Sequence, residues 1–193
     1  KKNELKFTKL LTDGKVLGLG KNSYGGFEST DVSKQIWIEE DFNPTIGEND
    51  FGVKVESLEK SSGKVTIDDA DIVVSAGRGM KGPENWAMIE ELASVLGAAT
   101  ACSKPVSDLG WRPHNEHVGQ TGKPVAANLY IAVGISGAIQ HIAGINSSKV
   151  KVVINSDPEA PFFKVADYGV VGDAFEFVPK LIVKLIAFKA HNS

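Results

Sequence analysis

The sequence has little of what marks a secreted, membrane-spanning or nucleic-acid-binding protein. It contains a single cysteine, Cys102, so no internal disulfide is possible, and this favours a reducing compartment. No apolar run approaches the roughly 18–20 residues that span a bilayer, because the long one near 181–188 is interrupted by Lys184 and bounded by Lys189. A net charge of −3 and a pI of about 5.8 do not favour nucleic acid as a partner.

What the chain does contain is typical of a soluble globular protein. Its 193 residues are 42% hydrophobic and 23% charged, enough for one α/β domain with a smaller appendage. Cys102 ends the apolar stretch AATAC, which predicts a small buried side chain more than a nucleophile.

The pattern of apolar residues in 1–65 differs from that in the rest of the chain. Short apolar alternations, such as 16–17, 36–38 and 53–58, are separated by polar or glycine-rich segments, which indicates strands and turns. A few strands of this kind do not make a core. We expect these strands to form the edge of a larger structure, or an arm that packs on a partner.

After residue 66 the pattern becomes strand, loop and helix, repeated. Apolar strands are predicted over 71–77, 98–102, 129–135, 150–155 and 168–173, and helices over 83–97, 136–144 and 175–188, with Pro179 interrupting or beginning the last. The expected fold is α/β: a doubly wound, mainly parallel sheet with helices on both faces. Ligands of such sheets bind at the carboxyl ends of the strands.

The first strand is followed by the glycine loop 77–82, which contains Arg78 and matches G-x-G-x-x-G. A lone match of this kind is weak. A nicotinamide site also needs a carboxylate at the end of the second strand, where this chain has Ser103 and Lys104. The loop therefore favours a phosphate or pyrophosphate group, and the alternative is a tight turn with a solvated arginine.

A long polar loop, 103–123, follows the second strand, and loops of this length are usually functional or disordered. Its last segment, 118–123, has two glycines flanking polar residues, a turn that brings backbone N–H groups close to a flat or anionic ligand. His114 and His117 are a weak candidate for a metal pair, since the loop adds no further Cys or His.

The third strand leads into Gly134–His141, which fails the G-x-S-x-G nucleophile pattern because position 138 is alanine. We interpret the segment as a helix N-terminus that holds an anionic group with the help of Ser136. His141 then donates a hydrogen bond to the ligand, or it is a core histidine. Asn155 and Asp173 end the fourth and fifth strands, where each is a helix cap or part of the ligand edge.

Taken in order, VVSAGRGMKGPENW, VGQTGK, LYIAVGISGAIQH, INSDPEAP and ADYGVVGD resemble the C-terminal half of electron-transfer flavoprotein alpha subunits, over about residues 45–188. The resemblance implies that FAD binds at the carboxyl edge of the sheet. By position, the FAD contacts would be Arg78, Ser103, Lys104, Val118, Gly119, Gln120, Thr121, Ser136, Gly137, Ala138, Ile139, Gln140, His141, Asn155 and Asp173.

The resemblance also implies an orientation for the cofactor. Gln120, Thr121 and His141 would lie near the flavin ring, and Arg78, Asn155 and Asp173 toward the nucleotide.

One position departs from the family pattern. Lys104 stands where the family usually has arginine, and it keeps the positive charge but loses the planar, multi-donor head. A cation near the ring stabilises anionic reduced flavin, so we expect the anionic semiquinone still to be favoured, but less strongly.

The implied function is an FAD-binding electron carrier with no substrate chemistry of its own and no catalytic or metal-binding residues. Its partners would be a beta subunit in a heterodimer, flavin dehydrogenases as donors and a quinone reductase or similar acceptor, in a bacterial cytoplasm or a mitochondrial matrix. Residues 1–65 would be the remnant of an N-terminal domain that is mostly absent, and residues 66–193 the FAD-binding domain. The rival interpretations are a nicotinamide-dependent oxidoreductase domain and a non-redox module that has lost flavin.

Overall fold

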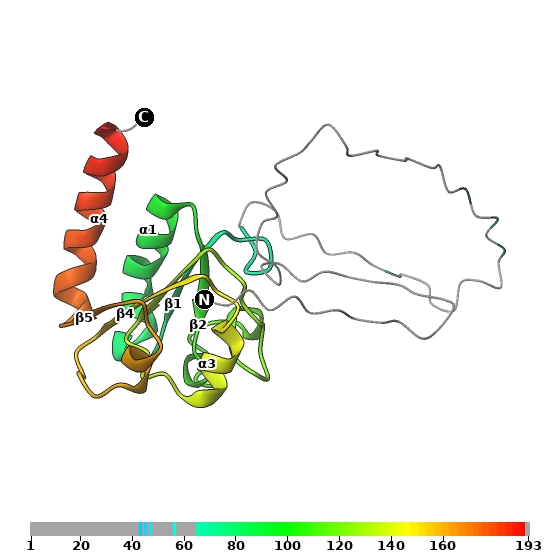
Figure 1. Cartoon of the computed structure of the whole chain (residues 1–193), viewed down its shortest axis with the longest axis horizontal. Helices are drawn as coiled ribbons and strands as arrows, with labels where there is room; N and C mark the ends of the chain where they lie inside the picture. The colour runs from blue at the N-terminus through cyan, green and yellow to red at the C-terminus, as the bar shows by residue number, and fades with distance from the viewer. Residues whose placement is uncertain (1–42, 44, 46, 48–55, 57–64, 192–193) are drawn as a thin grey trace, which may run out of the picture.

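The computed structural model describes residues 43, 45, 47, 56 and 65–191 (Figure 1). The strands predicted within 1–65 lie outside these residues, apart from single positions. The description below therefore concerns the α/β unit that follows.

Five parallel strands form one sheet in the order β2-β1-β3-β4-β5. Their bounds are Ile72–Ala76 for β1, Ala99–Cys102 for β2, Leu129–Val133 for β3, Val150–Asn155 for β4 and Tyr168–Val171 for β5. Strands β1 and β3 are buried almost throughout, as expected for the centre of a parallel sheet. The predicted parallel α/β sheet is confirmed.

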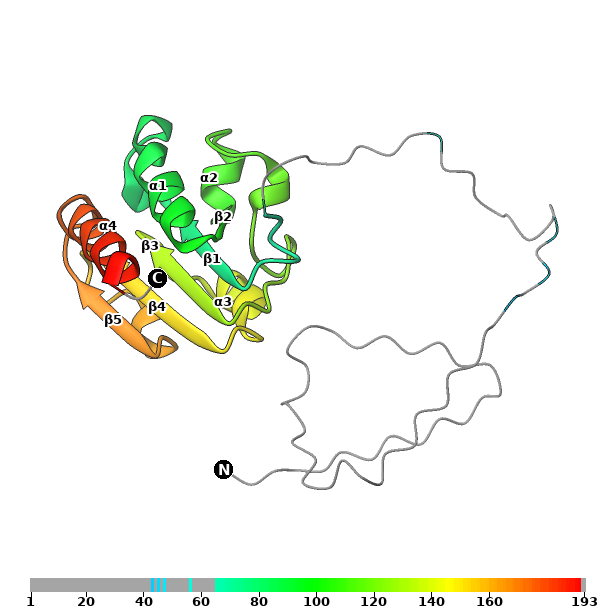
Figure 2. The same cartoon turned by 90° about the horizontal axis from the view of Figure 1, so that it is seen from above.

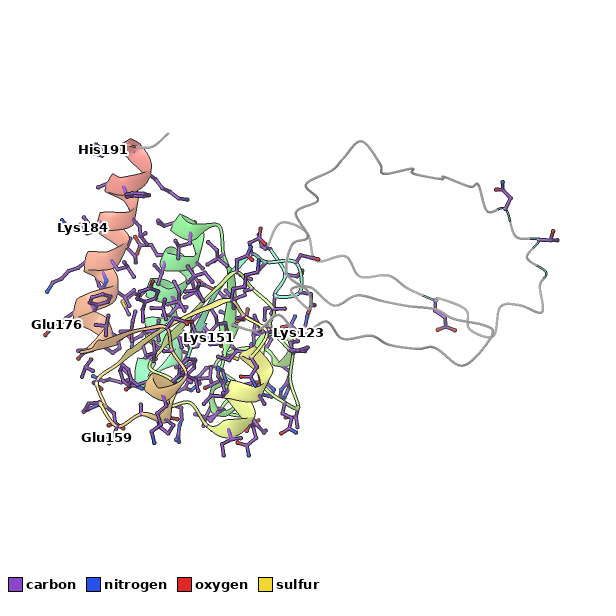
Figure 3. All side chains as sticks on the ribbon, viewed as in Figure 1. Lys123, Lys151, Glu159, Glu176, Lys184 and His191 are labelled. Carbon is purple, nitrogen blue, oxygen red and sulfur yellow. The ribbon has the colours of Figure 1, made fainter. Side chains whose placement is uncertain are left out.

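Helices cover both faces of this sheet (Figure 2). Helices α1 (Trp86–Leu96) and α4 (Ala174–His191) pack on one face, where Ile89, Leu92, Val178 and Ile182 meet the side chains of β1, β3 and β4. The short helix α3 (Ile139–Ile145) lies on the opposite face, whose core includes Ile145 and Phe162. Glu176, Lys184 and His191 are exposed along α4 (Figure 3), and no helix of the described region has the length and apolar character to cross a membrane.

Two elements differ from the expectation. The segment predicted as one long loop contains a helical turn, α2 (Lys104–Asp108), with Ser103 at its N-cap position and Pro105 in its first turn. Helix α4 runs through Pro179 without ending there. Proline removes one backbone hydrogen bond inside a helix, and burial of Val178 and Ile182 on either side keeps the helix packed against α1.

The loop between α2 and β3 is held in place by Arg112. Its guanidinium bonds both carboxylate oxygens of Glu116, at 2.7 and 2.6 Å, and Glu90 on α1 at 3.0 Å. It also lies over the Trp86 ring, with the guanidinium carbon 5.6 Å from the centroid. One side chain therefore fixes the loop that leads to residues 117–123.

The strand order places a crevice at the carboxyl end of the sheet. The chain leaves β1 toward β2 on one side, and later enters β3 on the other side of β1. Loops that leave two neighbouring strands in opposite directions separate above the sheet, and doubly wound proteins bind their ligands at this switch point. Here that point lies between β1 and β3.

Candidate functional site

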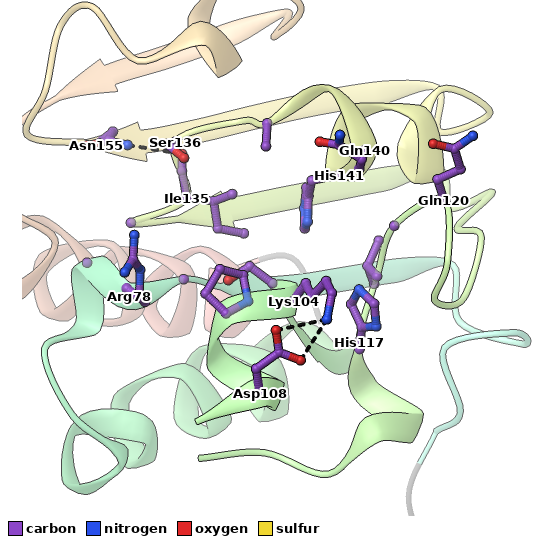
Figure 4. Close-up of a pocket in the computed structure, with 18 of the residues that line it drawn as sticks. Arg78, Lys104, Asp108, His117, Gln120, Ile135, Ser136, Gln140, His141 and Asn155 are labelled. Atoms are coloured by element: carbon purple, nitrogen blue, oxygen red, sulfur yellow. Dashed lines mark hydrogen bonds and ion pairs between the residues drawn. The ribbon is translucent and has the colours of Figure 1, made fainter. Parts of the chain in front are cut away.

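A cavity of about 640 Å³ opens at this switch point (Figure 4). Its size is within the range of roughly 300–1,000 Å³ found for ligand sites. The lining comes from every connection at the carboxyl edge except the one after β5: Gly77, Arg78, Gly79, Ser103, Lys104, Pro105, Asp108, His117, Val118, Gly119, Gln120, Thr121, Gly134, Ile135, Ser136, Ala138, Gln140, His141, Asn155 and Asp157.

The floor of the cavity is made by two glycine turns in close contact. Gly77 N–H donates to the Val133 carbonyl at 2.9 Å, and Gly79 N–H donates to the Gly134 carbonyl at 3.1 Å. A Cβ on Gly79 would lie 2.6 Å from Gly134 Cα, closer than any side chain allows. The glycines therefore let the β1 and β3 turns pack backbone to backbone and leave the space above them open.

The segment 118–123 extends the edge of the sheet beyond β2. Val118 N–H donates to the Cys102 carbonyl at 3.0 Å, and Gln120 N–H donates to the Gln140 carbonyl at 2.8 Å. A Cβ on Gly144 of α3 would lie 2.7 Å from Gly119 Cα, so the absence of a side chain allows this close packing. These contacts place Gln120 and Thr121 beside α3 at the cavity wall.

A charged cluster lines the wall formed by α2. Lys104 Nζ lies 2.8 Å from both carboxylate oxygens of Asp108, and this hydrogen bond lowers the pKa of Asp108. Burial, and then the charge of Lys104, lower the pKa of His117. The lysine thus reaches the cavity with its charge largely balanced by a carboxylate.

His141 is a neutral side chain in the wall opposite α2. Its exposed fraction is only 6%, and its Nε2 lies 2.8 Å from the Tyr130 hydroxyl. Burial lowers its pKa to about 4, helped by the charge of His117 and opposed by the main chain of Val118. Its Nδ1 is buried and has no hydrogen-bond partner among the described residues.

The two ends of the cavity differ in character. Arg78 is exposed in the turn after β1, and its side chain makes no ion pair or hydrogen bond with another described residue. Asn155 lies at the same end and donates from Nδ2 to the Ile135 carbonyl at 3.0 Å, beside Ser136 (Figure 4). Gln120 lies at the far end (Figure 4). A free cation and polar groups at one end, and buried neutral groups along the wall, suit an elongated ligand with an anionic part.

Most residues predicted for the site line this cavity, and three do not. Gly137 lies in the turn before α3 and Ile139 begins that helix, but neither is among the lining residues. Asp173 also lies outside the lining and caps α4, accepting from the Phe175 N–H at 2.9 Å, with Lys81 Nζ 4.0 Å away. Their contact with a cofactor stays a prediction, as do the roles of the lining residues.

The sequence interpretation missed several lining residues. Gly77, Gly79 and Gly134 belong to motifs that it quoted, but their role appears only when the two turns meet. Pro105 and Asp108 lie on the undetected helix α2, and an N-cap serine followed by proline was the signal that could have found it. His117 was considered only as half of a metal pair with His114, and Ile135 and Asp157 carry no signal of their own.

The structure bears on two chemical alternatives, a metal site and a reactive cysteine. No group of three or more His, Cys, Asp or Glu side chains within the described region is arranged to hold a metal ion. Cys102 is fully buried, as predicted, and burial raises the pKa of its thiol to about 12. A thiol that stays protonated in this way is a poor nucleophile.

Comparison with known proteins identifies relatives of this domain. Residues 66–146 match the family model described as the electron transfer flavoprotein FAD-binding domain. The electron transfer flavoprotein subunit alpha of Thermoanaerobacterium thermosaccharolyticum is 48% identical over 149 residues, which cover 77% of this chain and 45% of that protein. The mitochondrial subunit alpha of Dictyostelium discoideum is 53% identical over 151 residues, covering 78% and 42%.

A third relative extends the same result. The subunit alpha of Paracoccus denitrificans is 56% identical over 124 residues, which cover 64% of this chain and 40% of that protein. The chain thus spans less than half the length of each of these three relatives.

Proposed function

Because the chain belongs to the electron-transfer flavoprotein alpha-subunit family, we propose that it binds FAD in the cavity between β1 and β3 and serves as the flavin domain of an electron carrier. The observation that supports this most is the coincidence of the family match with a cavity at the switch point of the sheet. FAD is the cofactor named for this domain family.

The residues present fit FAD by their chemistry. The pyrophosphate of a dinucleotide needs cationic and N–H donors, and Arg78 supplies an exposed guanidinium beside the glycine turns. A flat ring needs apolar walls with a few polar groups, and Ile135, Val118 and His141 supply them. The buried Nδ1 of His141 has no geometrically sound hydrogen bond to any described residue, as expected of a polar atom that a ligand would satisfy.

Each of these groups has a proposed task. Arg78 and Asn155 hold the nucleotide end, and Gln120, Thr121 and His141 bind and orient the ring. Lys104 contributes positive charge, which the Asp108 carboxylate moderates. When bound, the flavin supplies the electron-accepting and electron-donating chemistry, and the protein supplies binding, orientation and electrostatics.

The electron partners follow from the family and are part of the proposal. A beta subunit would complete a heterodimer, flavin dehydrogenases would donate electrons, and a quinone reductase or similar acceptor would receive them. One relative is mitochondrial and others are bacterial, so we propose a mitochondrial matrix or a bacterial cytoplasm as the compartment.

The absorbance spectrum of the full chain tests the cofactor directly. The chain is incubated with FAD, desalted and scanned, alone and after co-expression with the beta subunit of a relative. We expect flavin bands that survive desalting in at least one of the two samples. A colourless protein in both would refute the proposal, and retention of NAD in its place would support the nicotinamide alternative.

Matched variants test whether the cavity is the site. Arg78→Ala removes the unpaired cation and should weaken FAD binding about tenfold or more, the cost of losing hydrogen bonds to a charged group. Lys180→Ala removes an exposed cation on α4, outside the cavity lining, and should leave affinity unchanged. Equal affinity in both variants would place FAD elsewhere.

A further inference from the structure

His117 is a buried polar side chain of the cavity lining without a hydrogen-bond partner in the described part of the chain. Its exposed fraction is 8%, close to the 6% of His141. Its ring makes no hydrogen bond or ion pair with another described residue. Buried polar groups in proteins are nearly always satisfied. Because His117 lines the cavity, the partner of its ring is whatever fills the cavity.

The main chain and two glycines give this imidazole a defined place. The N–H of His117 donates to the His114 carbonyl at 3.1 Å, and its own carbonyl accepts from the Lys123 N–H at 2.8 Å. A Cβ on Gly122 would lie 2.8 Å from Nδ1 of the ring, and a Cβ on Gly119 would lie 3.3 Å from Nε2. The ring therefore packs against a turn that has no side chains at these two positions, and it stays at the cavity wall.

Two imidazoles face the cavity from opposite walls. Figure 4 shows His117 beside Lys104 on the α2 side, and His141 across the opening on the α3 side. Burial, and then a charge on His117, lower the pKa of His141, so the two rings are within electrostatic reach of each other. A flat ligand in this cavity therefore has one imidazole on each side.

The groups around His117 leave its ring as the unused donor and acceptor of this wall. Burial and then the charge of Lys104 lower its pKa, His114 acts in the same direction and Asp108 opposes them, so the imidazole is neutral near pH 7. Lys104 and Asp108 bind each other, and His114 Nδ1 lies 2.9 Å from Ser107 Oγ. A neutral imidazole has one N–H donor and one acceptor nitrogen, and here neither is used by these neighbours.

We propose that His117 is a further ligand-binding residue of the cavity, which hydrogen-bonds the polar edge of a flat heteroaromatic ring from the wall opposite His141. The edge of the flavin ring carries carbonyl acceptors and an N–H donor, so a neutral imidazole matches it in either tautomer. This inference rests on the proposed function, because FAD is the ligand. It adds a contact from the α2 side to those of Gln120, Thr121 and His141.

Proton–carbon NMR of the full chain, labelled with ¹³C-histidine, tests the contact. The chain has four histidines, and each ring signal is assigned by its loss in the corresponding His→Gln variant. On saturation with FAD, added with the beta subunit of a relative if the chain alone does not retain it, the signals of His117 and His141 should shift. His114 is exposed outside the cavity lining and His191 ends α4, so their signals should stay in place.

FAD titration of matched variants tests the hydrogen bond. His117→Leu has a similar size but no polar atom, and it should raise the Kd about fivefold, the value of one neutral hydrogen bond. His117→Gln keeps a donor and an acceptor, so its Kd should lie between those of His117→Leu and the wild type. His114→Gln changes the neighbouring histidine outside the lining and should bind FAD like the wild type.

The outcomes separate this inference from the proposed function. FAD that binds and shifts the His141 signal while the His117 signal stays in place overturns the inference alone, as does wild-type affinity in His117→Leu. If His117→Leu does not fold, the NMR spectrum of the wild-type chain decides. If FAD is retained neither by the chain alone nor with the beta subunit, the proposed function fails and the inference fails with it.

Discussion

The buried imidazole of His141 should make the stability of the domain depend on pH in a defined window. Its pKa is about 4 in the folded chain and 6.5 as a reference value, because burial disfavours the charged form. Between these values the unfolded chain binds a proton that the folded chain does not. Stability from this group is therefore complete above pH 6.5, is lost as pH falls, and stops changing below about pH 4.

The size of the effect follows from the two pKa values. The difference between 6.5 and about 4 corresponds to about 3 kcal/mol of unfolding free energy. Urea unfolding followed by far-UV circular dichroism, at several pH values from 7 to 4, measures this loss. In His141→Gln, which is neutral at every pH, the loss over the same range should be smaller by about 3 kcal/mol.

The quantity compared between variants is the slope of unfolding free energy against pH. This comparison separates the effect of the imidazole from the general cost of the substitution. Gln140→Ala changes an exposed neighbour on the same helix without removing the imidazole, and it should keep the wild-type slope. If the wild type and His141→Gln lose equal free energy between pH 7 and pH 4, the imidazole is not held neutral in the folded chain, and the reasoning is refuted.

Three further variants test the packing and electrostatics of the site. Gly79→Ala should lower stability in urea by roughly 1–3 kcal/mol, because its Cβ would lie 2.6 Å from Gly134 Cα. Arg112→Lys should cost about 1–2 kcal/mol in the same assay, since lysine cannot replace the fork that binds two carboxylates. Asp108→Asn should tighten FAD binding by about twofold to threefold at low salt, because it removes the carboxylate that balances Lys104.

Each of these three predictions has a control or an outcome that would contradict it. Gly110→Ala, at a positive φ of 72° with open space around it, measures backbone strain alone and should cost less than Gly79→Ala. Wild-type stability of Arg112→Lys would mean that the loop is held by other contacts. Unchanged FAD affinity of Asp108→Asn at low and high salt would mean that the Lys104 charge does not reach the cofactor.

The strands and the longest helices could be predicted because their residues carry a local signal. Apolar runs such as 71–77 become buried strands, and the spacing of apolar residues over 83–97 becomes α1 with Gly97 as its left-handed cap. Helix α2 has no apolar periodicity over its five residues, so the sequence pattern predicts a loop there. Pro179 gave a local signal for a break that tertiary packing overrides.

The candidate site was harder, because its shape depends on contacts between distant segments. Knowing that ligands bind at strand ends was enough to select the connections that form the cavity. It was not enough to place β1 between β2 and β3, which decides where the crevice opens. Asp173 shows the same limit, since a carboxylate at a strand end has the same sequence signature whether it caps a helix, as it does here, or contacts a ligand.

His141 illustrates why two sequence interpretations need not exclude each other. The sequence left it either as a core histidine or as a donor to the ligand. In the structure it is 6% exposed, bonded to a fully buried tyrosine, and also part of the cavity wall. Burial keeps the imidazole neutral, and a neutral imidazole has one definite donor nitrogen that its neighbours can select. Core packing therefore fixes a side chain that also lines the cavity, and the two interpretations of His141 are compatible.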